Sequence, residues 1–339
     1  MAQAVPSSAA ANVGGPEFNI MGFGDISYLS STADDPGGFT VGQAVMHLSA
    51  SLDKSFSVFG EFSLTAHDTE YTAEVERLIV KYEFSDLLKV SAGRYHTPIG
   101  YWNTAFHHGA WLQTTVSRPE VFRFGSEIVP IHFVGGLLEG TLPNNSLGLS
   151  YMAGFGNGRH ANIARAGDAG DTNDSSAWMV EVNARPARFR GLHAGIGLYS
   201  DVASPTGKPD IDEKIYSAYA VWTRESPEVL FEYLYSTHSV ANNSSVNGDV
   251  HAWYAQVAYR LGRDLQHWKP YVRYEYNNID DSDPLLGDQG LNYEGAIVGV
   301  RWDFSQYAAL KAEFRNEEFN SSGRENGIRL QVSFVLAKL

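Results

Sequence analysis

Residues 328–336 read Ile-Arg-Leu-Gln-Val-Ser-Phe-Val-Leu, a stretch in which apolar and polar side chains alternate. Because successive side chains of a strand point to opposite faces, this period of two predicts a β-strand with one apolar and one wet face. The same alternation returns at 310–315, 272–277 and 56–65. The polar faces carry charges, whereas the apolar faces end in Tyr and Trp, as at the interfaces of a membrane barrel. We therefore expect an all-β, transmembrane, antiparallel β-barrel rather than a soluble sandwich, whose polar faces would point outward.

The breaks between these stretches are short and long in turn. Short ones include 53–54, 85–86 and 305–306. Long ones lie at 95–127, 157–174, 201–213, 237–249, 278–290 and 317–326. This sorting is typical of up-and-down barrels with tight turns at one end and long loops at the other. A count of the segments predicts about sixteen strands, with fourteen or eighteen as the alternatives, and sixteen are enough to enclose an aqueous channel. The predicted strands lie near 17–29, 39–52, 55–66, 72–84, 88–95, 128–141, 147–156, 176–185, 192–200, 215–224, 229–236, 250–261, 268–277, 292–303, 308–316 and 327–336.

Composition narrows the class of protein further. We expect residues 16–339 to form one barrel domain and residues 1–15, rich in Ser, Ala and Gly, to form a flexible tail. The start, Met1-Ala2-Gln3-Ala4, reads as a mature N-terminus with an added Met, so we expect a removed export signal and a bacterial outer-membrane location. The net charge of −14 argues against a nucleic-acid partner. The absence of Cys excludes thiolate nucleophiles and Cys-based zinc sites.

The longest break, 95–127, is too rich in aromatic residues for a solvated outer loop. It contains Tyr101, Trp102 and Phe106, and further along Trp111, Phe122 and Phe124. A structureless segment of this length in a compact fold is usually functional. We expect it to fold into the lumen, bury its aromatic rings against the wall and narrow the pore.

The beginning of that segment carries a family resemblance. The run Gly93-Arg94-Tyr95-His96-Thr97-Pro98-Ile99-Gly100-Tyr101-Trp102-Asn103, with the strand and turn before it, resembles the phosphate-selective porin O/P superfamily. The motif occupies about 40 residues, although the strand and turn layout is compatible with that superfamily over most of the chain. The resemblance implies a homotrimer of sixteen-stranded barrels, each with a pore narrowed by its third outer loop, and it implies anion transport.

Charged and aromatic residues on the predicted inner face are the candidate pore residues. Arg94 falls on the lipid face by strict alternation, where an Arg costs roughly 2–4 kcal/mol, so we expect it to face the lumen near the root of the loop. The basic, histidine and aromatic candidates are Arg77, Lys81, Arg94, His96, Tyr101, Trp102, His107, His108, Arg118, Arg123, Arg273, Arg301, Lys311, Arg315 and Arg329. The acidic candidates are Glu61, Glu139, Glu275 and Glu313.

Acids and bases mix along this face, so the residues themselves leave the ion preference open. The function that they indicate is passive diffusion of small polar or ionic solutes past a constriction between the 95–127 loop and Arg and Lys side chains on the opposite wall. A substrate-specific channel is the alternative, for phosphate or another anion, or for sugars stacked on inward tyrosines. Those tyrosines are Tyr71, Tyr219, Tyr254, Tyr271 and Tyr293. An enzyme is disfavoured because no nucleophile elbow, zinc-protease motif or phosphate loop is present, and an adhesin is disfavoured by the modest loops.

A group of histidines and a group of acidic loop residues are the two candidate metal sites. Adjacent histidines on an extended chain point opposite ways, so we expect His107 and His108, even with His96 and His132 near, to line the constriction rather than bind a metal, and we expect no cofactor. A pH-sensitive constriction remains an alternative. The acidic loop residues are expected to be solvated tips, with divalent cations that bridge them to one another or to lipopolysaccharide as the alternative. They are Asp168, Asp171, Asp174, Asp201, Asp210, Asp212, Glu213, Asp280, Asp281, Asp283 and Asp288.

Overall fold

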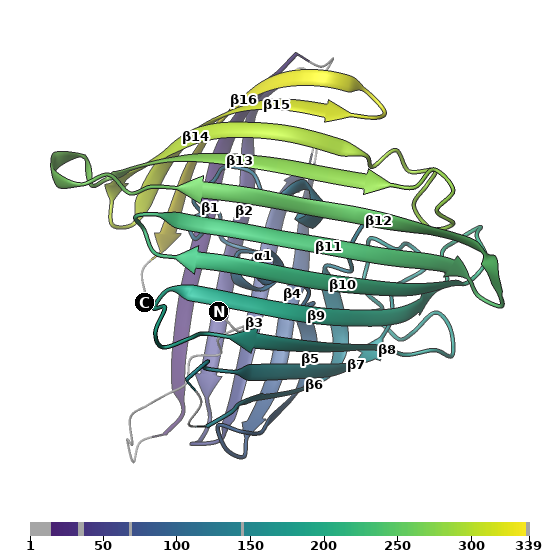
Figure 1. Cartoon of the computed structure of the whole chain (residues 1–339). Helices are drawn as coiled ribbons and strands as arrows, with labels where there is room; N and C mark the ends of the chain where they lie inside the picture. The colour runs from purple at the N-terminus through teal and green to yellow at the C-terminus, as the bar shows by residue number, and fades with distance from the viewer. Residues whose placement is uncertain (1–14, 33–36, 68–69, 144–145, 337–339) are drawn as a thin grey trace.

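The computed structural model describes residues 15–32, 37–67, 70–143 and 146–336, so the predicted tail lies almost wholly outside the described residues. Within them, sixteen antiparallel strands form one closed barrel, in which each strand pairs with the next and β1 pairs with β16. The predicted fold class and strand number are therefore confirmed. Strands of the front wall cross those of the rear wall steeply, as the tilt of strands in a barrel requires (Figure 1).

The strands follow one another around the barrel in chain order. Their bounds are β1 Glu17–Ser31, β2 Gly38–Ser51, β3 Phe56–His67, β4 Glu70–Glu83, β5 Lys89–His96, β6 His132–Thr141, β7 Ser150–Asn157, β8 Ala177–Ala184, β9 Leu192–Ala203, β10 Ile211–Thr223, β11 Glu228–Val240, β12 Asn243–Ala258, β13 Trp268–Ile279, β14 Tyr293–Ser305, β15 Ala308–Phe319 and β16 Gly323–Leu336. Three short helices interrupt the connections between described strands: α1 Tyr101–Ala105, η1 Glu120–Phe122 and η2 Arg263–Leu265. None of the helices in the described ranges has the length and apolarity to cross a bilayer.

The predictions of long loops at 237–249 and 317–326 are wrong, because the strands continue through these residues. The ladder between β11 and β12 runs on to Val240 opposite Asn243, and that between β15 and β16 runs to Phe319 opposite Gly323. Both faces of these tips are polar, rich in Ser, Asn and Glu, so the alternation that marks the rest of the strand fades there. Backbone pairing needs no apolar face, and for this reason hydrophobic periodicity under-predicts such hairpins.

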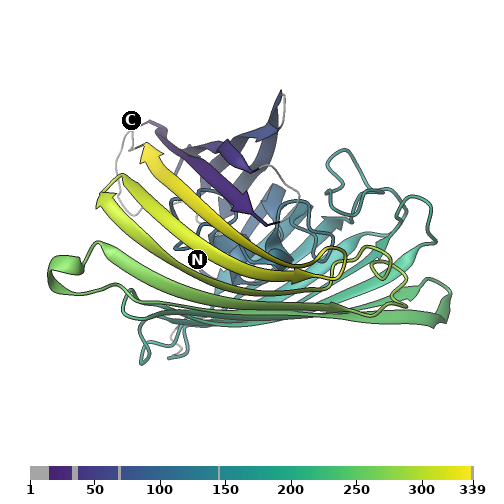
Figure 2. The same ribbon diagram turned by 90° about the horizontal axis from the view of Figure 1, so that it is seen from above.

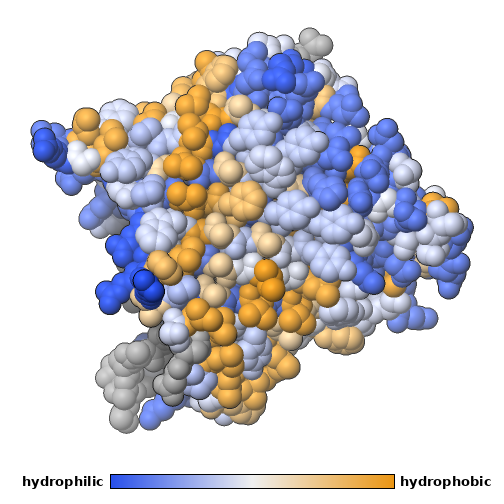
Figure 3. Space-filling view, viewed as in Figure 1, coloured by the Kyte–Doolittle hydropathy of each residue, from blue (hydrophilic) through white to orange (hydrophobic). Residues whose placement is uncertain are grey.

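Strand β13 shows how the sequence pattern becomes a two-faced wall. Trp268, Val272 and Tyr274 are exposed on the outside, whereas the alternate residues Lys269 and Arg273 are buried inside. The other strands repeat this arrangement, which leaves large apolar side chains on the outer surface. On the face shown in Figure 3, hydrophobic side chains form a band across the strands beside residues of intermediate hydropathy, and hydrophilic ones gather toward the two ends of the barrel.

Strand β4 breaks the alternation at a β-bulge. Arg77 lies opposite Glu61 and Val75 lies opposite Phe62, so Glu76 is the extra residue. Both Glu76 and Arg77 are consequently buried inside the barrel. The bulge reverses the phase of every residue before it, so the predicted inward orientation of Tyr71 is wrong and its side chain is 65% exposed.

Candidate pore constriction

The chain between β5 and β6, residues 97–131, lies inside the barrel, and we call it the constriction segment. Figures 1 and 2 show α1 between the front and rear walls. Tyr101, Trp102 and Phe122 of this segment belong to the apolar core, whereas Phe124 is 40% exposed. The Trp102 ring meets Tyr254 of β12 edge to face, with centroids 5.9 Å apart. Burial of rings of this size fixes the segment in place.

Glu232 of β11 binds the start of α1. Its carboxylate oxygens accept hydrogen bonds from the backbone N–H groups of Tyr101 and Trp102, the second at 2.8 Å. Tyr254 donates its hydroxyl to the same carboxylate. Gly100 precedes the helix with φ of 74°, a conformation that L side chains rarely adopt.

Replacement of Gly100 by alanine is expected to loosen this end of the segment. An added Cβ would lie 2.4 Å from Glu232 Oε2 and 2.9 Å from Phe122 Cζ, so the helix start must move away from its carboxylate. With positive φ adding about 1 kcal/mol or more, we expect a lower unfolding midpoint in urea and noisier single-channel current. Gly207→Ala is the matched control, because Gly207 also has positive φ (79°) but an added Cβ would meet nothing within 4 Å. Equal effects of the two substitutions would contradict the role of close packing.

The wall formed by β13–β15 holds the second half of the segment. The Arg273 guanidinium donates to the Thr115 hydroxyl at 3.1 Å, to Ser117 O at 3.0 Å and to Arg118 O at 3.1 Å. Glu313 accepts from Val116 N at 3.0 Å and Ser117 N at 3.3 Å.

The neighbouring wall residues extend this pattern along the segment. Glu275 accepts from the backbone N–H of Glu120. Arg301 donates to Trp111 O at 2.7 Å and Gln113 O at 2.9 Å, and Lys311 donates to Thr115 O at 3.0 Å. The sequence leaves open which Arg and Lys side chains face the loop. In the structure Arg273, Arg301 and Lys311 lie against it and donate to its carbonyl groups.

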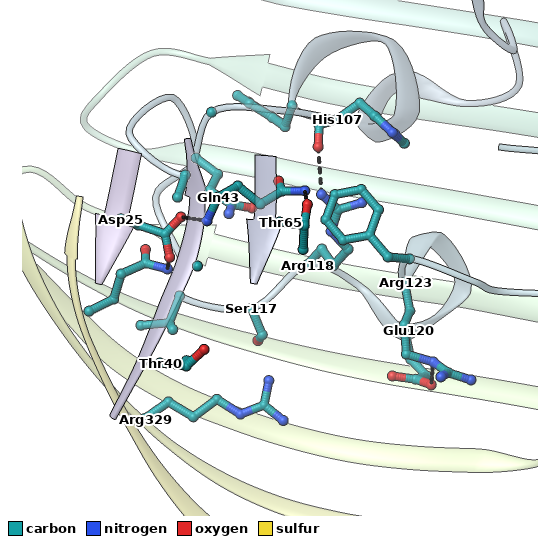
Figure 4. A pocket seen from close by; sticks show the side chains of 18 of the residues that line it. Asp25, Thr40, Gln43, Thr65, His107, Ser117, Arg118, Glu120, Arg123 and Arg329 are labelled. Carbon is teal, nitrogen blue, oxygen red and sulfur yellow. Dashed lines mark hydrogen bonds and ion pairs between the residues drawn. The ribbon is translucent and has the colours of Figure 1, made fainter. Parts of the chain in front are cut away.

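A cavity of about 510 Å³ lies between the segment and the wall of β1–β3, β15 and β16 (Figure 4). Four arginines and three carboxylates line it: Arg118, Arg123, Arg315, Arg329, Asp25, Glu120 and Glu317.

Two of these arginines are neutralised locally, Arg123 by Glu120 at 2.6 Å and Arg315 by Glu317. Arg118 instead stacks on the Phe124 ring, 3.3 Å from its centroid, and no ion pair joins Arg118 or Arg329 to a carboxylate of the described residues. Asp25 also forms no ion pair among the described residues, so the four arginines and three carboxylates leave the cavity with one excess positive charge.

The remaining charged candidates lie on the β3–β6 wall. Arg77 pairs with Glu61, and Lys81 pairs with Glu139 at 2.6 Å. Arg94 lines a smaller cavity at the rim and bonds Asp168 at 2.7 Å.

Four histidines and one glutamate meet where the segment crosses this wall. His96 ends β5 directly opposite His132, which begins β6. His107 and His108 follow α1, and the bulge of β4 supplies Glu76. We call these five residues the histidine cluster, and their ligand-type atoms all lie within 4.8 Å of one another. The chain at 106–108 is bent rather than extended, so the expectation that His107 and His108 point apart is wrong; their ring centroids are 4.4 Å apart.

Glu76 of the histidine cluster is not among the residues predicted from the sequence, and three outer-loop acids expected to be solvated lie differently. Glu76 was overlooked because the bulge is not visible in an alternation pattern, although the consecutive charges Glu76-Arg77 were a signal of it. Asp201, Glu213 and Asp283 are buried rather than solvated.

These buried acids join neighbouring outer loops. His238 contacts Asp283 at 2.7 Å and Glu213 at 3.2 Å, and Arg159 contacts Glu213 at 3.0 Å. Among the described residues, this network links the chain after β7 to the ends of β10 and β11 and to the loop before β14.

No protein-family model matches this chain, and no curated protein matches it. Solved structures do match. The anion-selective porin from Comamonas acidovorans is similar with a TM-score of 0.68 and 10% identity, over 95% of this chain and all of that one. OmpF of Salmonella typhi, solved in complex with daunomycin, is similar with a TM-score of 0.63 and 12% identity, over 95% of this chain and 98% of that one. OmpT, an outer-membrane protein of Vibrio cholerae, is similar with a TM-score of 0.61 and 15% identity, over 97% of this chain and all of that one. At these identities the likeness establishes the fold, and this chain has the porin fold.

Proposed function

We propose that this protein is an outer-membrane porin that lets small polar or ionic solutes diffuse passively through its lumen. The observation that carries the proposal is the constriction segment, fastened inside a sixteen-strand barrel beside a charge-lined cavity. Barrels of this width enclose a channel, whereas narrow ones are filled by side chains. The residues that fasten the segment make it a fixed constriction rather than a loose plug.

We propose further that the pore favours anions. Arg118 and Arg329 present charge to the cavity without a carboxylate partner in the described part of the chain, and positive walls concentrate anions. The anion-selective Comamonas porin shares the fold. Phosphate is one candidate solute, supported by the resemblance to the phosphate-selective porin O/P superfamily. Sugars are less favoured, because Tyr254, Tyr271 and Tyr293 are at most 2% exposed and offer no stacking surface.

The outward apolar side chains support placement in the outer membrane, in contact with its lipid and lipopolysaccharide. We propose a homotrimer on the same resemblance. Chemical cross-linking of the detergent-solubilised protein should then stop at a three-chain band, and a ladder that stops at one chain would contradict it.

The decisive experiment for channel function is single-channel recording in a planar bilayer under a salt gradient. We expect uniform conductance steps and a reversal potential whose sign indicates that anions permeate more readily than cations. Protein that inserts and never conducts would overturn the porin proposal in favour of a plugged or enzymatic barrel. A reversal potential of the opposite sign would overturn the anion preference alone.

The ion preference should depend on pH through Glu120. Burial of this carboxyl group raises its pKa to about 7; the nearby Glu275 and Glu317 add to the rise, while Arg123 and Arg315 oppose it. Glu120 is therefore neutral below pH 7 and negative above it, so a change from pH 5.5 to 8.5 should weaken the anion preference. The reversal potential measures this, and Glu120→Gln should flatten the dependence. An unchanged pH dependence in that variant would assign the titration to another group.

A further inference from the structure

The histidine cluster has the donor set of a metal site. Imidazole nitrogens with one carboxylate suit Zn²⁺ and the neighbouring divalent transition metals, whereas Ca²⁺ and Mg²⁺ take oxygen ligands. The Nε2 atoms of His108 and His132 lie 3.1 and 3.0 Å from the same oxygen, Oε2 of Glu76. The His96 and His107 rings are tilted against each other by 39°, with centroids 3.9 Å apart.

The outer contacts of the rings indicate which nitrogens are free to bind. His107 Nδ1 lies 2.9 Å from Asn103 Oδ1, and His108 Nδ1 lies 3.1 Å from Gln43 Oε1. An imidazole that donates its Nδ1 proton to an amide oxygen keeps a lone pair on Nε2, and metal-binding histidines are usually oriented in this way. The Nε2 atom of His107 is buried and has no hydrogen-bond partner in the described residues. A buried polar atom without a partner destabilises the fold, and a bound cation would remove that cost.

The charged residues around the histidine cluster affect which kind of cation it would bind. Arg94 lies 3.7 Å from Glu76, and the paired Arg77 and Glu61 lie beside His96, where Glu61 Oε2 is 3.5 Å from Nε2. Arg118 adds a third arginine beside the cluster, because its guanidinium donates to His107 O, so the surrounding charges alone would not attract a cation. The imidazoles are left to set the preference, which favours a metal held by nitrogen over one held by charge alone.

We propose that Glu76, His107, His108 and His132, with His96 as the adjoining fifth residue, bind one divalent transition metal ion of the Zn²⁺ class. Glu76 lies on β4, His107 and His108 lie in the constriction segment, and His132 lies on β6. The ion would therefore fasten the segment to one wall, while Arg273 on β13 holds it to the opposite wall. Ligands of a tetrahedral zinc ion at about 2.0–2.1 Å lie closer together than the 4.8 Å spread of the cluster, so its side chains rotate inward on binding. A site enclosed by protein ligands has a structural role rather than a catalytic one.

The test uses the folded full-length barrel in detergent, without an affinity tag, stripped with a chelator and then titrated with Zn²⁺ alone. One equivalent per chain should bind, as read by calorimetry and by metal analysis after gel filtration. His107→Ala and His132→Ala should abolish this binding, and Gln43→Ala, which removes an outer contact, should weaken it about 10–100-fold. His251→Ala is the matched control, because this histidine on β12 is 41% exposed and lies outside the cluster.

X-ray absorption of the zinc-loaded native protein gives a second measurement that needs no variant to fold. Several nitrogen ligands at about 2.0–2.1 Å would support the site. Binding that survives both histidine variants, or zinc held by oxygen alone, would overturn the proposal. So would a native barrel that binds no zinc, and the converging nitrogens would then share protons with Glu76. Metal content is measured independently of conductance, so the channel proposal and the metal proposal can fail separately.

Discussion

Arg273→Ala is expected to release the second half of the constriction segment and to give a larger, noisier single-channel conductance. The Arg273 side chain is 0% exposed and holds Thr115, Ser117 and Arg118 from β13. Alanine would remove the donor from the acceptor atoms of Thr115, Ser117 and Arg118 and from the Glu275 carboxylate, which lies 2.7 Å away. Removal of one partner of a buried ion pair typically costs about 3–5 kcal/mol.

Two measurements separate the functional effect from the structural one. Urea unfolding, followed by tryptophan fluorescence, reads the loss of stability, and bilayer recording reads the width of the constriction. Arg324→Ala is the control, because it removes an arginine whose partner Glu318 lies on the exposed β15–β16 hairpin, with side chains 52% and 49% exposed. That surface pair should contribute about 0–1 kcal/mol. If Arg273→Ala matched Arg324→Ala in both measurements, Arg273 would not hold the segment.

Much of the barrel is predictable because its physics is local. Alternation along 328–336 and its counterparts reflects a wall with lipid on one side and the lumen on the other, and each strand carries that pattern in its own sequence. The pattern fails where a neighbouring strand decides the geometry. Tyr71 and Glu76 are misjudged because the bulge in β4 is defined by pairing with β3, which sequence periodicity does not encode.

The contacts of the candidate site are less predictable, because they join segments that are distant in the chain. The alternation of polar and apolar residues predicts that Arg273, Arg301, Lys311 and Glu313 face inward, and they are buried inside the barrel. It cannot show that they bind the backbone of a segment about 150 to 200 residues away in the chain, because those contacts follow from barrel closure. A charged residue that faces the lumen can either meet solute or hold the constriction, and only the three-dimensional arrangement separates the two roles.

We expect Arg329 to meet solute rather than to hold the constriction, so its charge should control ion preference. It lies on β16 opposite Glu313, and its guanidinium points into the cavity (Figure 4). None of its contacts with the described residues is an ion pair, whereas Arg315 beside it is paired with Glu317. A unit charge about 4 Å from a passing ion changes its energy by about 1 kcal/mol in water and by about 4 kcal/mol at an effective dielectric constant of 20.

Arg329→Glu changes the cavity by two charges, so the ratio of anion to cation permeability should fall at least about tenfold and the reversal potential should change sign. Arg329→Gln removes one charge and should give an intermediate value, which shows that charge rather than side-chain shape is responsible. Arg324→Glu makes the same two-charge change on the exposed outer hairpin, where salt screens it within about 8–10 Å, and should leave the sign unaltered. An equal shift of the reversal potential in Arg329→Glu and Arg324→Glu would mean that the overall electric field of the protein sets the ion preference. No shift in Arg329→Glu would mean that ions pass the constriction by another route.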